Sequence, residues 1–159
     1  MTRIIHQKSK LLYLLIIILL ASCVKNEVFF KYQPVNVNGW SKDSVYTFDV
    51  TIDDPSANYN FYVNTRNRGE YPYQNLWLFI SEVRQDSTVT KDSINFYLAD
   101  DYGKWLGSGV GPIYNMPVLY RQNFKFAKSG RYRYQIQHGM RDSMLVGIND
   151  IGLKIEKVE

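Results

Sequence analysis

Apolar and polar residues alternate along most of the chain beyond residue 27, with the period of two that is typical of half-buried β-strands. In residues 46–52 the aromatic and aliphatic side chains share one face, and the Thr and Asp side chains share the other. Residues 76–83 begin with apolar side chains on both faces, which predicts a central strand. No helical period of useful length occurs in this part of the chain. The pattern predicts about eight strands, at residues 28–32, 45–53, 59–63, 76–83, 94–98, 120–126, 132–136 and 151–155.

Turn-forming residues separate these segments, for example Asn38-Gly39, Asn67-Arg68-Gly69 and Ser129-Gly130. Many short strands with polar turns and no helices predict an all-β fold, and specifically an antiparallel β-sandwich. We favour a jelly-roll-like version of that sandwich. The apolar faces of the predicted strands place these side chains in the core: Phe48, Val50, Leu78, Ile94, Phe96, Tyr134 and Leu153.

The N-terminus has a different pattern. Basic residues within 3–10 precede an uninterrupted apolar run at 11–20, and two small residues then lead to Cys23. This is the layout of a secretory signal peptide, because the run is well short of the roughly 20 residues that a transmembrane helix needs. Leu20-Ala21-Ser22-Cys23 resembles the bacterial lipobox, in which the Cys thiol takes a diacylglyceryl group. The alternative is an ordinary cleaved signal in which Cys23 stands by chance. We therefore divide the chain into a lipoprotein signal peptide at 1–22, a lipidated tether at 23–27 and a single β-sandwich domain at 28–159.

Composition changes the picture once residues 1–22 are set aside. Three of the 19 Lys and Arg residues lie in that segment, which leaves 16 basic residues against 15 acidic ones. This nearly neutral balance gives no basis for a nucleic-acid partner. Cys23 is the one Cys of the chain, so no intrachain disulfide can form and the predicted domain depends on its core for stability.

The chemistry-bearing residues argue against an enzyme, and against any cofactor other than the covalent lipid on Cys23. Beyond residue 22 the chain has one His, His138, and no Gly-x-Ser-x-Gly motif, so we expect no Cys–His metal set and no nucleophile elbow. The pair Asp100-Asp101 is open to two interpretations, as calcium ligands or as exposed residues that favour a turn. His138 is either a base or, as we favour, a hydrogen-bonded residue at the end of a strand.

The longest irregular stretch, residues 99–117, contains a loop at 100–114 that is too long to be a mere connection. Its aromatic residues make it a candidate recognition site, because flat aromatic faces give a large contact area at low entropic cost. The alternative is that Trp105 and Leu106 fold inward and close one end of the sandwich. The candidate recognition residues of this loop are Asp101, Tyr102, Trp105 and Tyr114.

A second candidate surface lies on the strand predicted at 132–136. Arg131, Arg133, Gln135 and Gln137 share one face of this strand. That face is either a polar binding face, with Arg131 and Arg133 as candidate recognition residues, or the ordinary solvated outer face of an antiparallel sheet.

Several longer motifs together resemble one known family. These motifs are Leu20–Cys23, Tyr73–Leu78, Asp101–Gly109, Gln137–Arg141 and Gly147–Lys157. On these motifs, essentially the whole chain resembles the GldH family of gliding-motility lipoproteins of the Bacteroidetes. The family pattern carries Gln where this chain has His138, which argues against a special role for the imidazole. Residues 149–153 are also similar to the last strand of jelly-roll carbohydrate-binding modules.

The resemblance implies a lipoprotein of the cell envelope that is needed for gliding and has no established chemical activity. We therefore expect a non-enzymatic accessory or docking component of the envelope motility and secretion machinery. It should be anchored by lipid to a membrane, with the outer membrane favoured, on its periplasmic or surface face. Its expected partners are that membrane and other gliding or secretion proteins of the envelope. The alternative is a carbohydrate-binding envelope lipoprotein, with glycan as the ligand of a jelly-roll module.

The dipeptide Asp-Ser occurs four times, which is more often than chance placement of these residues gives. Each copy is followed by an aliphatic residue, Met or Thr, a pattern that resembles the O-glycosylation acceptor of Bacteroidetes envelope proteins. The alternative is turn formation, which both residues favour. Glycosylated serines should be exposed, on loops or strand ends away from the docking surface. The candidate acceptors are Ser44, Ser87, Ser93 and Ser143.

Overall fold

A computed structural model of the chain describes residues 26–109 and 111–158. The predicted signal peptide and the predicted lipid attachment site Cys23 lie outside these residues. Among the residues that the structure describes, no helix has the length and apolar character that crossing a membrane would require. The strands are β1 Glu27–Pro34, β2 Trp40–Ser41, β3 Tyr46–Ile52, β4 Tyr59–Arg68, β5 Asn75–Arg84, β6 Val89–Tyr97, β7 Ile113–Phe124, β8 Gly130–His138, β9 Met144–Leu145 and β10 Ile148–Lys157.

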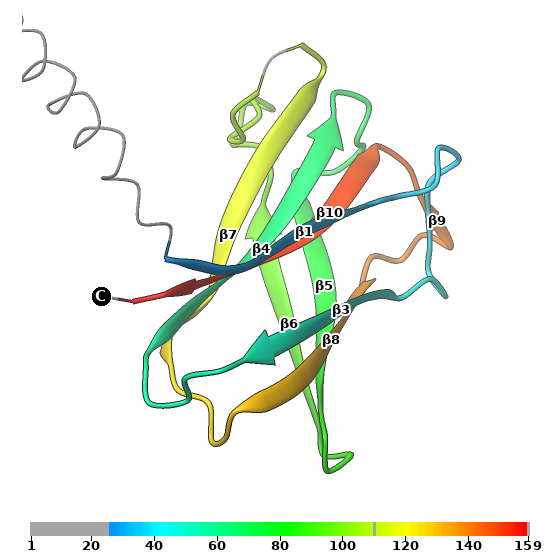
Figure 1. The fold of residues 1–159 in the computed structure, drawn as a ribbon. Coiled ribbons are helices and arrows are strands. Elements are labelled where there is room, and N and C mark those ends of the chain that lie inside the picture. The colour runs from blue at the N-terminus through cyan, green and yellow to red at the C-terminus, as the bar shows by residue number, and fades with distance from the viewer. Residues whose placement is uncertain (1–25, 110, 159) are drawn as a thin grey trace, which may run out of the picture.

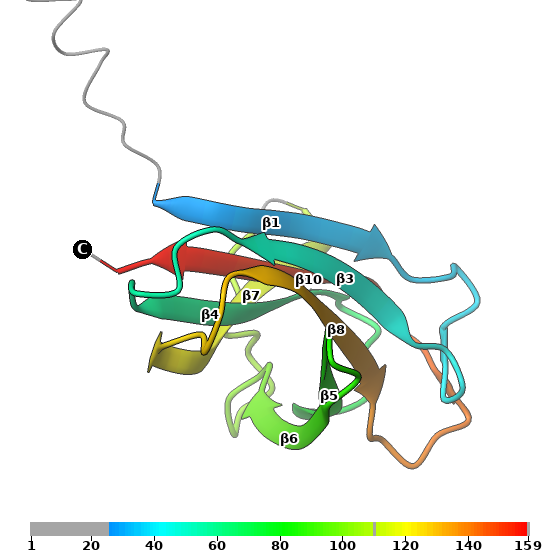
Figure 2. The same cartoon turned by 60° about the horizontal axis from the view of Figure 1, so that its bottom comes forward.

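Two four-stranded sheets pack face to face as a β-sandwich (Figures 1 and 2). One sheet has the order β1-β10-β4-β7 and the other has the order β3-β8-β5-β6, and every neighbouring pair is antiparallel. Numbered among the long strands alone, these orders become 1-8-3-6 and 2-7-4-5, which is the arrangement of a jelly roll. The short strands β2 and β9 pair with each other. The predicted all-β, jelly-roll-like sandwich is therefore confirmed.

The core lies between the two sheets and follows the alternation seen in the sequence. In β3 the side chains of Phe48, Val50 and Ile52 are buried, and the residues between them are exposed. Of the predicted core residues, all are buried except Ile94, which is half-buried because its strand β6 is an edge strand. Full burial of a side chain of this size stabilises the fold by about 1.5–3 kcal/mol, so this core supplies the stability that no disulfide provides.

The predicted strands correspond to the eight long strands of the structure, with one correction that bears on the candidate site. Residues 113–117, predicted as irregular, form the first part of β7, so Tyr114 lies on a strand and not in a loop. Met116 and Val118 pack against the core, so apolar core-facing residues do alternate with other residues in this part of the sequence. Pro117 obscured this alternation, because a Pro within a strand is expected only at a sheet edge, which is where β7 lies.

The sandwich has two ends, and the chain enters at one of them. Because all neighbouring strands are antiparallel, the connections gather at two opposite ends (Figure 1). We call the end where β1 begins the tether end, and the opposite one the distal end. The tether end consists of the entry to β1, the loops at 53–58, 85–88 and 125–129, and the residues after β10; the distal end consists of the segments 35–45, 69–74, 98–112 and 139–147.

The entry to β1 is fixed to the last strand of the same sheet. The backbone N–H of Lys157 donates to the carbonyl oxygen of Asn26 at 2.7 Å. Strand β1 then begins at Glu27, the residue that we predicted as the last of the tether. Asn26, three residues after Cys23 in the sequence, is therefore in contact with the domain.

Candidate recognition surfaces

The distal segment 98–112 begins with a tight turn that Asp100 holds. Its carboxylate oxygen Oδ1 accepts hydrogen bonds from the backbone N–H groups of Tyr102 (3.0 Å) and Lys104 (2.9 Å). Such local bonding is the reason that Asp favours turns. Asp101 beside it is exposed, and the described residues contain no group of three or more His, Cys, Asp or Glu that could hold a metal ion. The turn interpretation therefore accounts for Asp100, and Tyr102 extends from the turn with 97 % of its side chain exposed.

Trp105 is half-buried and packs against the core, as the inward-folding alternative expected. Its ring centroid lies 5.7 Å from that of Tyr114 on β7 and 6.4 Å from that of Tyr71 in the segment 69–74. Leu106, which we expected to fold inward with it, is instead 51 % exposed, because consecutive residues of an extended segment point to opposite sides. The stack joins three separate segments of the chain, and Leu106 and Tyr102 are the large apolar side chains that the described part of this loop exposes to solvent.

The remainder of the segment covers part of the free edge of β7. Ser108 and Asn115 exchange both backbone hydrogen bonds, at 3.0 Å and 2.7 Å. Gly107 permits this approach, since a Cβ there would lie 2.9 Å from the carbonyl oxygen of Asn115. An uncovered edge strand is a site for pairing with another chain. Gly107 thus has a structural explanation in the protection of an edge.

The polar residues predicted to share one face of a strand do so. Along β8 they alternate with buried residues and lie on the outer face of the β3-β8-β5-β6 sheet. Arg133 pairs with Asp49 of β3, its Nε lying 2.7 Å from Oδ1, and this hydrogen bond holds the pKa of Asp49 below its usual range. Arg131 is exposed and has no ion-pair partner among the described residues. Arg131 and Arg133 of the polar row are therefore exposed, whereas Gln135 and Gln137 are half-buried.

Aromatic side chains lie beside this polar row on the same outer face, and the sequence alone did not reveal them as a surface. Trp77 and Phe79 on β5 are 43 % and 48 % exposed, and Tyr97 on β6 is 59 % exposed. The register places Phe79 opposite Gln137 of the polar row. One feature of the sequence could have indicated this surface. Residues 76–83 begin with apolar side chains on both faces, and those on the outer face form part of the exposed aromatic strip.

A hollow of about 350 Å³ lies where the aromatic strip meets the distal end. At its rim the hydroxyl of Tyr73 donates to Oδ2 of Asp142 at 2.6 Å, and this bond raises the pKa of Tyr73. Gly139 allows the strip to pack closely, since a Cβ there would lie 3.1 Å from the ring of Phe79. Arg141 is exposed. The hollow is lined by Tyr73, Trp77, Gly139, Met140 and Arg141.

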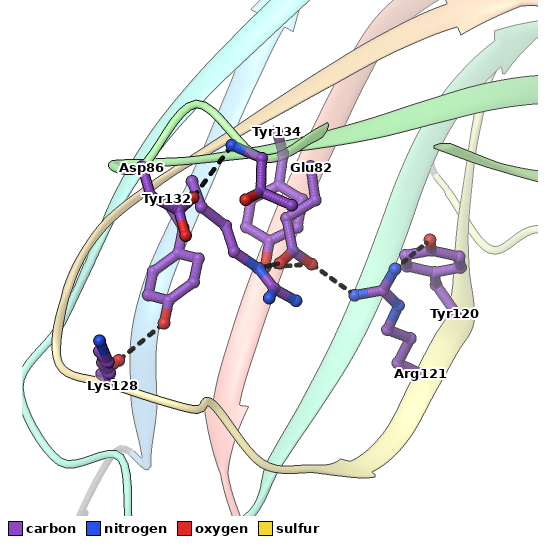
Figure 3. Close-up of polar contacts among 9 residues, drawn as sticks. Glu82, Asp86, Tyr120, Arg121, Lys128, Tyr132 and Tyr134 are labelled. Carbon is purple, nitrogen blue, oxygen red and sulfur yellow. Dashed lines mark hydrogen bonds and ion pairs between the residues drawn. The ribbon is translucent and has the colours of Figure 1, made fainter. Parts of the chain in front are cut away.

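Between the sheets, toward the tether end, a buried ion-pair cluster surrounds Glu82 of β5 (Figure 3). Glu82 is 1 % exposed, and its Oε2 lies 2.7 Å from Nη1 of Arg121, which comes from β7 of the opposite sheet. Its Oε1 accepts a hydrogen bond from Nε of Arg84 at 2.9 Å. The hydroxyl of Tyr134 donates to Oε2 at 3.4 Å, and burial raises the pKa of this phenol. Because its partners compensate the buried carboxylate, the cluster serves to join the two sheets rather than to move a proton.

His138 ends β8 as expected, but it is not hydrogen-bonded. The side chain is fully buried, and its ring lies edge-on to that of Trp40 with the centroids 5.4 Å apart. Neither ring nitrogen has a partner in hydrogen-bond geometry among the described residues, so that part of the expectation was wrong, although the backbone of Trp40 lies near enough to raise the pKa of the imidazole. Burial lowers the pKa of the imidazole, which is therefore neutral near pH 7.

The candidate acceptor serines are all exposed, but they do not all lie on loops. Ser44, Ser87 and Ser143 are in loops next to strands. Ser93 lies in the middle of the edge strand β6, directly opposite Phe79 of the aromatic strip. The expectation of loops or strand ends was therefore wrong for Ser93. Ser44 and Ser143 are in loops as expected, but these loops belong to the distal end and adjoin the exposed Val45 and Met144, so of the four serines Ser87 alone is in a loop at the tether end.

Comparison with known proteins decides the family. The sequence profile of the family described as GldH lipoprotein matches residues 27–155, which is most of the chain and almost all of the sandwich. The chain belongs to the GldH lipoprotein family. It is 35 % identical over 158 residues to the gliding motility lipoprotein GldH of Flavobacterium johnsoniae, with 94 % of this chain and 97 % of the relative covered. It is 34 % identical over 157 residues to a gliding motility lipoprotein GldH homolog of Christiangramia forsetii, with 94 % and 95 % covered.

Membership in the GldH family confirms the resemblance that the sequence motifs carried. This GldH-family chain is a lipoprotein, and as a lipoprotein it is a membrane-anchored protein of the cell envelope. The relatives' names connect the family with gliding motility.

Proposed function

We propose that the protein is a non-enzymatic docking component of the envelope motility and secretion machinery, and that its distal end binds a protein partner. The lipid attached at Cys23 would hold the opposite end at a membrane, with the outer membrane favoured. The distal end is then the part of the domain that is free to meet another envelope protein.

The observation that carries this proposal is the uneven distribution of exposed apolar side chains. Among the described residues, 14 large apolar side chains are exposed, and two of them, Val28 and Val89, lie at the tether end. A concentration of exposed apolar groups marks an interaction site, and aromatic residues dominate the affinity of such sites. Nine of the 14 belong to the distal end or to strand residues that adjoin it: Val37, Val45, Tyr73, Trp77, Tyr97, Tyr102, Leu106, Met144 and Val146.

The proposal is tested by measuring gliding in cells that lack this protein and instead express a variant of it. A variant that combines Trp77→Ala, Tyr102→Ala and Leu106→Ala should abolish gliding and the crosslinking of the lipoprotein to its envelope neighbour. The melting temperature should stay nearly unchanged, since all three side chains are substantially exposed.

A matched variant controls for the loss of apolar surface as such. Val28→Ala with Val89→Ala removes exposed apolar groups from the tether end and should leave gliding intact. Normal gliding of the distal variant, with the protein present at normal levels, would show that the partner binds elsewhere.

A second candidate function, glycan binding, rests on the hollow beside Trp77. Its aromatic side chains stand next to the charged Arg141 and to the amide pair Asn75–Asn95, whose Nδ2 and Oδ1 atoms are 2.8 Å apart. Flat aromatic faces with neighbouring amide and charged groups suit a sugar ring. Titration of purified envelope polysaccharide should then show binding that Trp77→Ala abolishes and Tyr102→Ala leaves intact. Equal loss in both variants would favour a protein partner.

O-glycosylation remains a separate proposal for the exposed serines Ser44, Ser87, Ser93 and Ser143. Intact-mass measurement of the native protein against its Ser→Ala variants tests each one. A glycan on Ser93 would cover the aromatic strip, so modification there and docking through Phe79 exclude one another.

A further inference from the structure

We propose that the tether end rests on the membrane that holds the Cys23 lipid, and that Lys125, Lys128 and Arg131 bind the phosphate groups of its lipids. The domain then stands upright, with the distal end directed away from that membrane surface.

The length of chain between the lipid and the fold is the first support. Three residue steps separate Cys23 from Asn26, which is already hydrogen-bonded to β10. A fully extended chain spans at most about 3.6 Å per residue, so the entry to β1 lies within about 11 Å of the lipid attachment point. This span is close to the Debye length of about 8 Å at physiological ionic strength, so charges near this entry feel the headgroup phosphates.

A chain of contacts through the residues after β10 and the start of β4 connects the entry to β1 with the loop at 125–129. The backbone N–H of Val158, just after β10, donates to the carbonyl oxygen of Asn58 at 2.8 Å. The next residue, Tyr59, has its ring centroid 5.3 Å from that of Phe126. The loop at 125–129 therefore belongs to the same end of the sandwich as the tether, as Figure 2 also shows.

Three cations at this end are free to bind an anion. Lys125, Lys128 and Arg131 are exposed, and none of them has an ion-pair partner among the described residues. Lys128 and Arg131 also line a hollow of about 230 Å³ together with Arg84. A Lys presents a point charge to a phosphate and an Arg presents a planar pair of donors, so together they suit a headgroup phosphate.

The acids at this end oppose the cations less than their number indicates. Asp54 is paired with Lys157 at 2.7 Å, which holds the pKa of its carboxyl at about 2. Asp86 lines the same hollow, and its Oδ1 accepts the backbone N–H of Thr88 at 3.0 Å. Asp53 is the other acid of these loops and is exposed. Across the whole tether end three carboxylates have no ion-pair partner among the described residues: Asp53, Asp86 and the exposed Glu27. The three free cations equal them in number, but they are clustered within residues 125–131, which contain no acid.

The polarity of the loops at the tether end determines how deeply this end enters the membrane. The loops 53–58, 85–88 and 125–129 expose no large apolar side chain among the described residues. Val28 and Val89, at the borders of this end, are exposed, but two separate valines gain little from the hydrocarbon layer, whereas the cations of the loops gain from the headgroup layer. The tether end thus lies on the membrane and does not insert into it.

Site-specific fluorescence in vesicles tests this arrangement. The full-length lipidated chain is reconstituted into phosphatidylethanolamine–phosphatidylglycerol vesicles that carry a headgroup-linked quencher. One fluorophore is attached to Ser129→Cys in the tether-end loop or, in a second protein, to Tyr102→Cys at the distal end; lipidation occupies the thiol of Cys23. We expect the probe at residue 129 to be quenched several-fold more strongly than the probe at residue 102.

Charge reversal then tests the role of the three cations. Lys125→Glu, Lys128→Glu and Arg131→Glu together should at least halve the quenching at residue 129, since each unit of charge at an anionic surface changes the binding constant about fivefold. Salt at about 1 M should have the same effect on the wild-type protein, because it shortens the Debye length to roughly 3 Å. Arg141→Glu is the matched control at the distal end and should leave the quenching unchanged.

Three results would overturn the proposal. They are equal quenching of the two probes, undiminished quenching at residue 129 in the triple variant, and an intact mass that shows no lipid on Cys23. Thermal melting of the triple variant must match that of the wild-type protein, as expected for exposed charges. If it does not, the single variant Lys128→Glu gives the same test with a smaller expected decrease.

Discussion

The tether end and the distal end of this sandwich are built from the same kinds of strands and loops, yet they differ both inside and outside. At the tether end the buried charge of Glu82 is compensated by Arg121, Arg84 and Tyr134, and the surface loops are polar. At the distal end the buried His138 has no partner in hydrogen-bond geometry among the described residues, and exposed apolar side chains gather on the surface.

The difference indicates a division of labour within one small domain. Polar groups that are fully compensated hold the sheets together where the chain attaches to its anchor. Incompletely compensated polar groups lie at the opposite end, where Thr65 and Asn67 of β4 also carry buried oxygen atoms without partners. Such groups reduce stability, and departures from good local chemistry concentrate where a protein binds something.

Among the changes that test the difference between the two ends, the largest effect should come from releasing the tether end from the membrane. Cys23→Ser removes the predicted lipid attachment atom, so the folded domain should move completely from the membrane fraction to the soluble fraction. Metabolic labelling with palmitate should mark the wild-type protein and not the variant. A wild-type protein without label, or a variant that stays in the membrane fraction at high salt, would contradict the assignment of Cys23.

The next largest effect concerns the interior of the tether end. Glu82→Ala should reduce the free energy of unfolding by about 3–5 kcal/mol, because it leaves the partly buried guanidinium of Arg121 uncompensated. Urea denaturation measures the change. The exposed pair Asp49–Arg133 is the matched control, and Asp49→Ala should change stability by less than about 1 kcal/mol. Similar values for the two variants would mean that Glu82 does not join the sheets.

Most of the strand positions could be predicted because they depend on the pattern of apolar and polar residues within each short segment. The period of two in β3 and the double-faced apolar start of β5 gave strand positions that the structure confirms. The detailed strand order could not be predicted from such local patterns, because strands far apart in the sequence pair with each other. For example, β1 and β10 pair although they lie at opposite ends of the chain. The two-residue strands β2 and β9 are too short to show any period.

The candidate sites were less predictable, because they depend on what lies across from each residue. The row along β8 was found from its spacing, but its aromatic neighbours Trp77 and Phe79 come from another strand. The sequence placed Trp105 and Tyr114 in one loop and left the direction of Trp105 open. The structure places Trp105 in the loop and Tyr114 on β7, and the ring of Trp105 contacts those of both Tyr114 and Tyr71.

Two neighbouring positions of the distal loop should respond differently to truncation. Trp105→Ala should lower the free energy of unfolding by about 2 kcal/mol, roughly half the value for a fully buried aromatic residue, because its ring is half-buried in the stack. Tyr102→Ala should change stability by less than about 0.5 kcal/mol, since its side chain is almost wholly exposed. Thermal and urea unfolding compare them directly, and a stability loss in Tyr102→Ala equal to that in Trp105→Ala would show that the whole loop packs inward.

The smallest effect is a pH dependence that belongs to the distal end. Because burial lowers the pKa of His138 in the folded state, the unfolded chain takes up a proton first as the pH falls. The contribution of the neutral imidazole to stability is therefore present above the unfolded pKa of about 6.5 and declines below it, by at most about 1.4 kcal/mol per pH unit. The loss stops once the pH is below the folded pKa as well.

His138→Gln isolates this contribution, because Gln has similar polarity but does not titrate. Between pH 7 and pH 5 the wild-type protein should lose more stability than the variant, and the difference between them is the part that His138 carries. Lys42 and Asp142 act on the imidazole in opposite directions, the ammonium lowering its pKa and the carboxylate raising it. Asp142→Asn should therefore lower the pKa further and steepen the decline over this range. Parallel pH profiles for the wild-type protein and His138→Gln would show that the imidazole is hydrated in solution, and the interior of the distal end would then be no less compensated than that of the tether end.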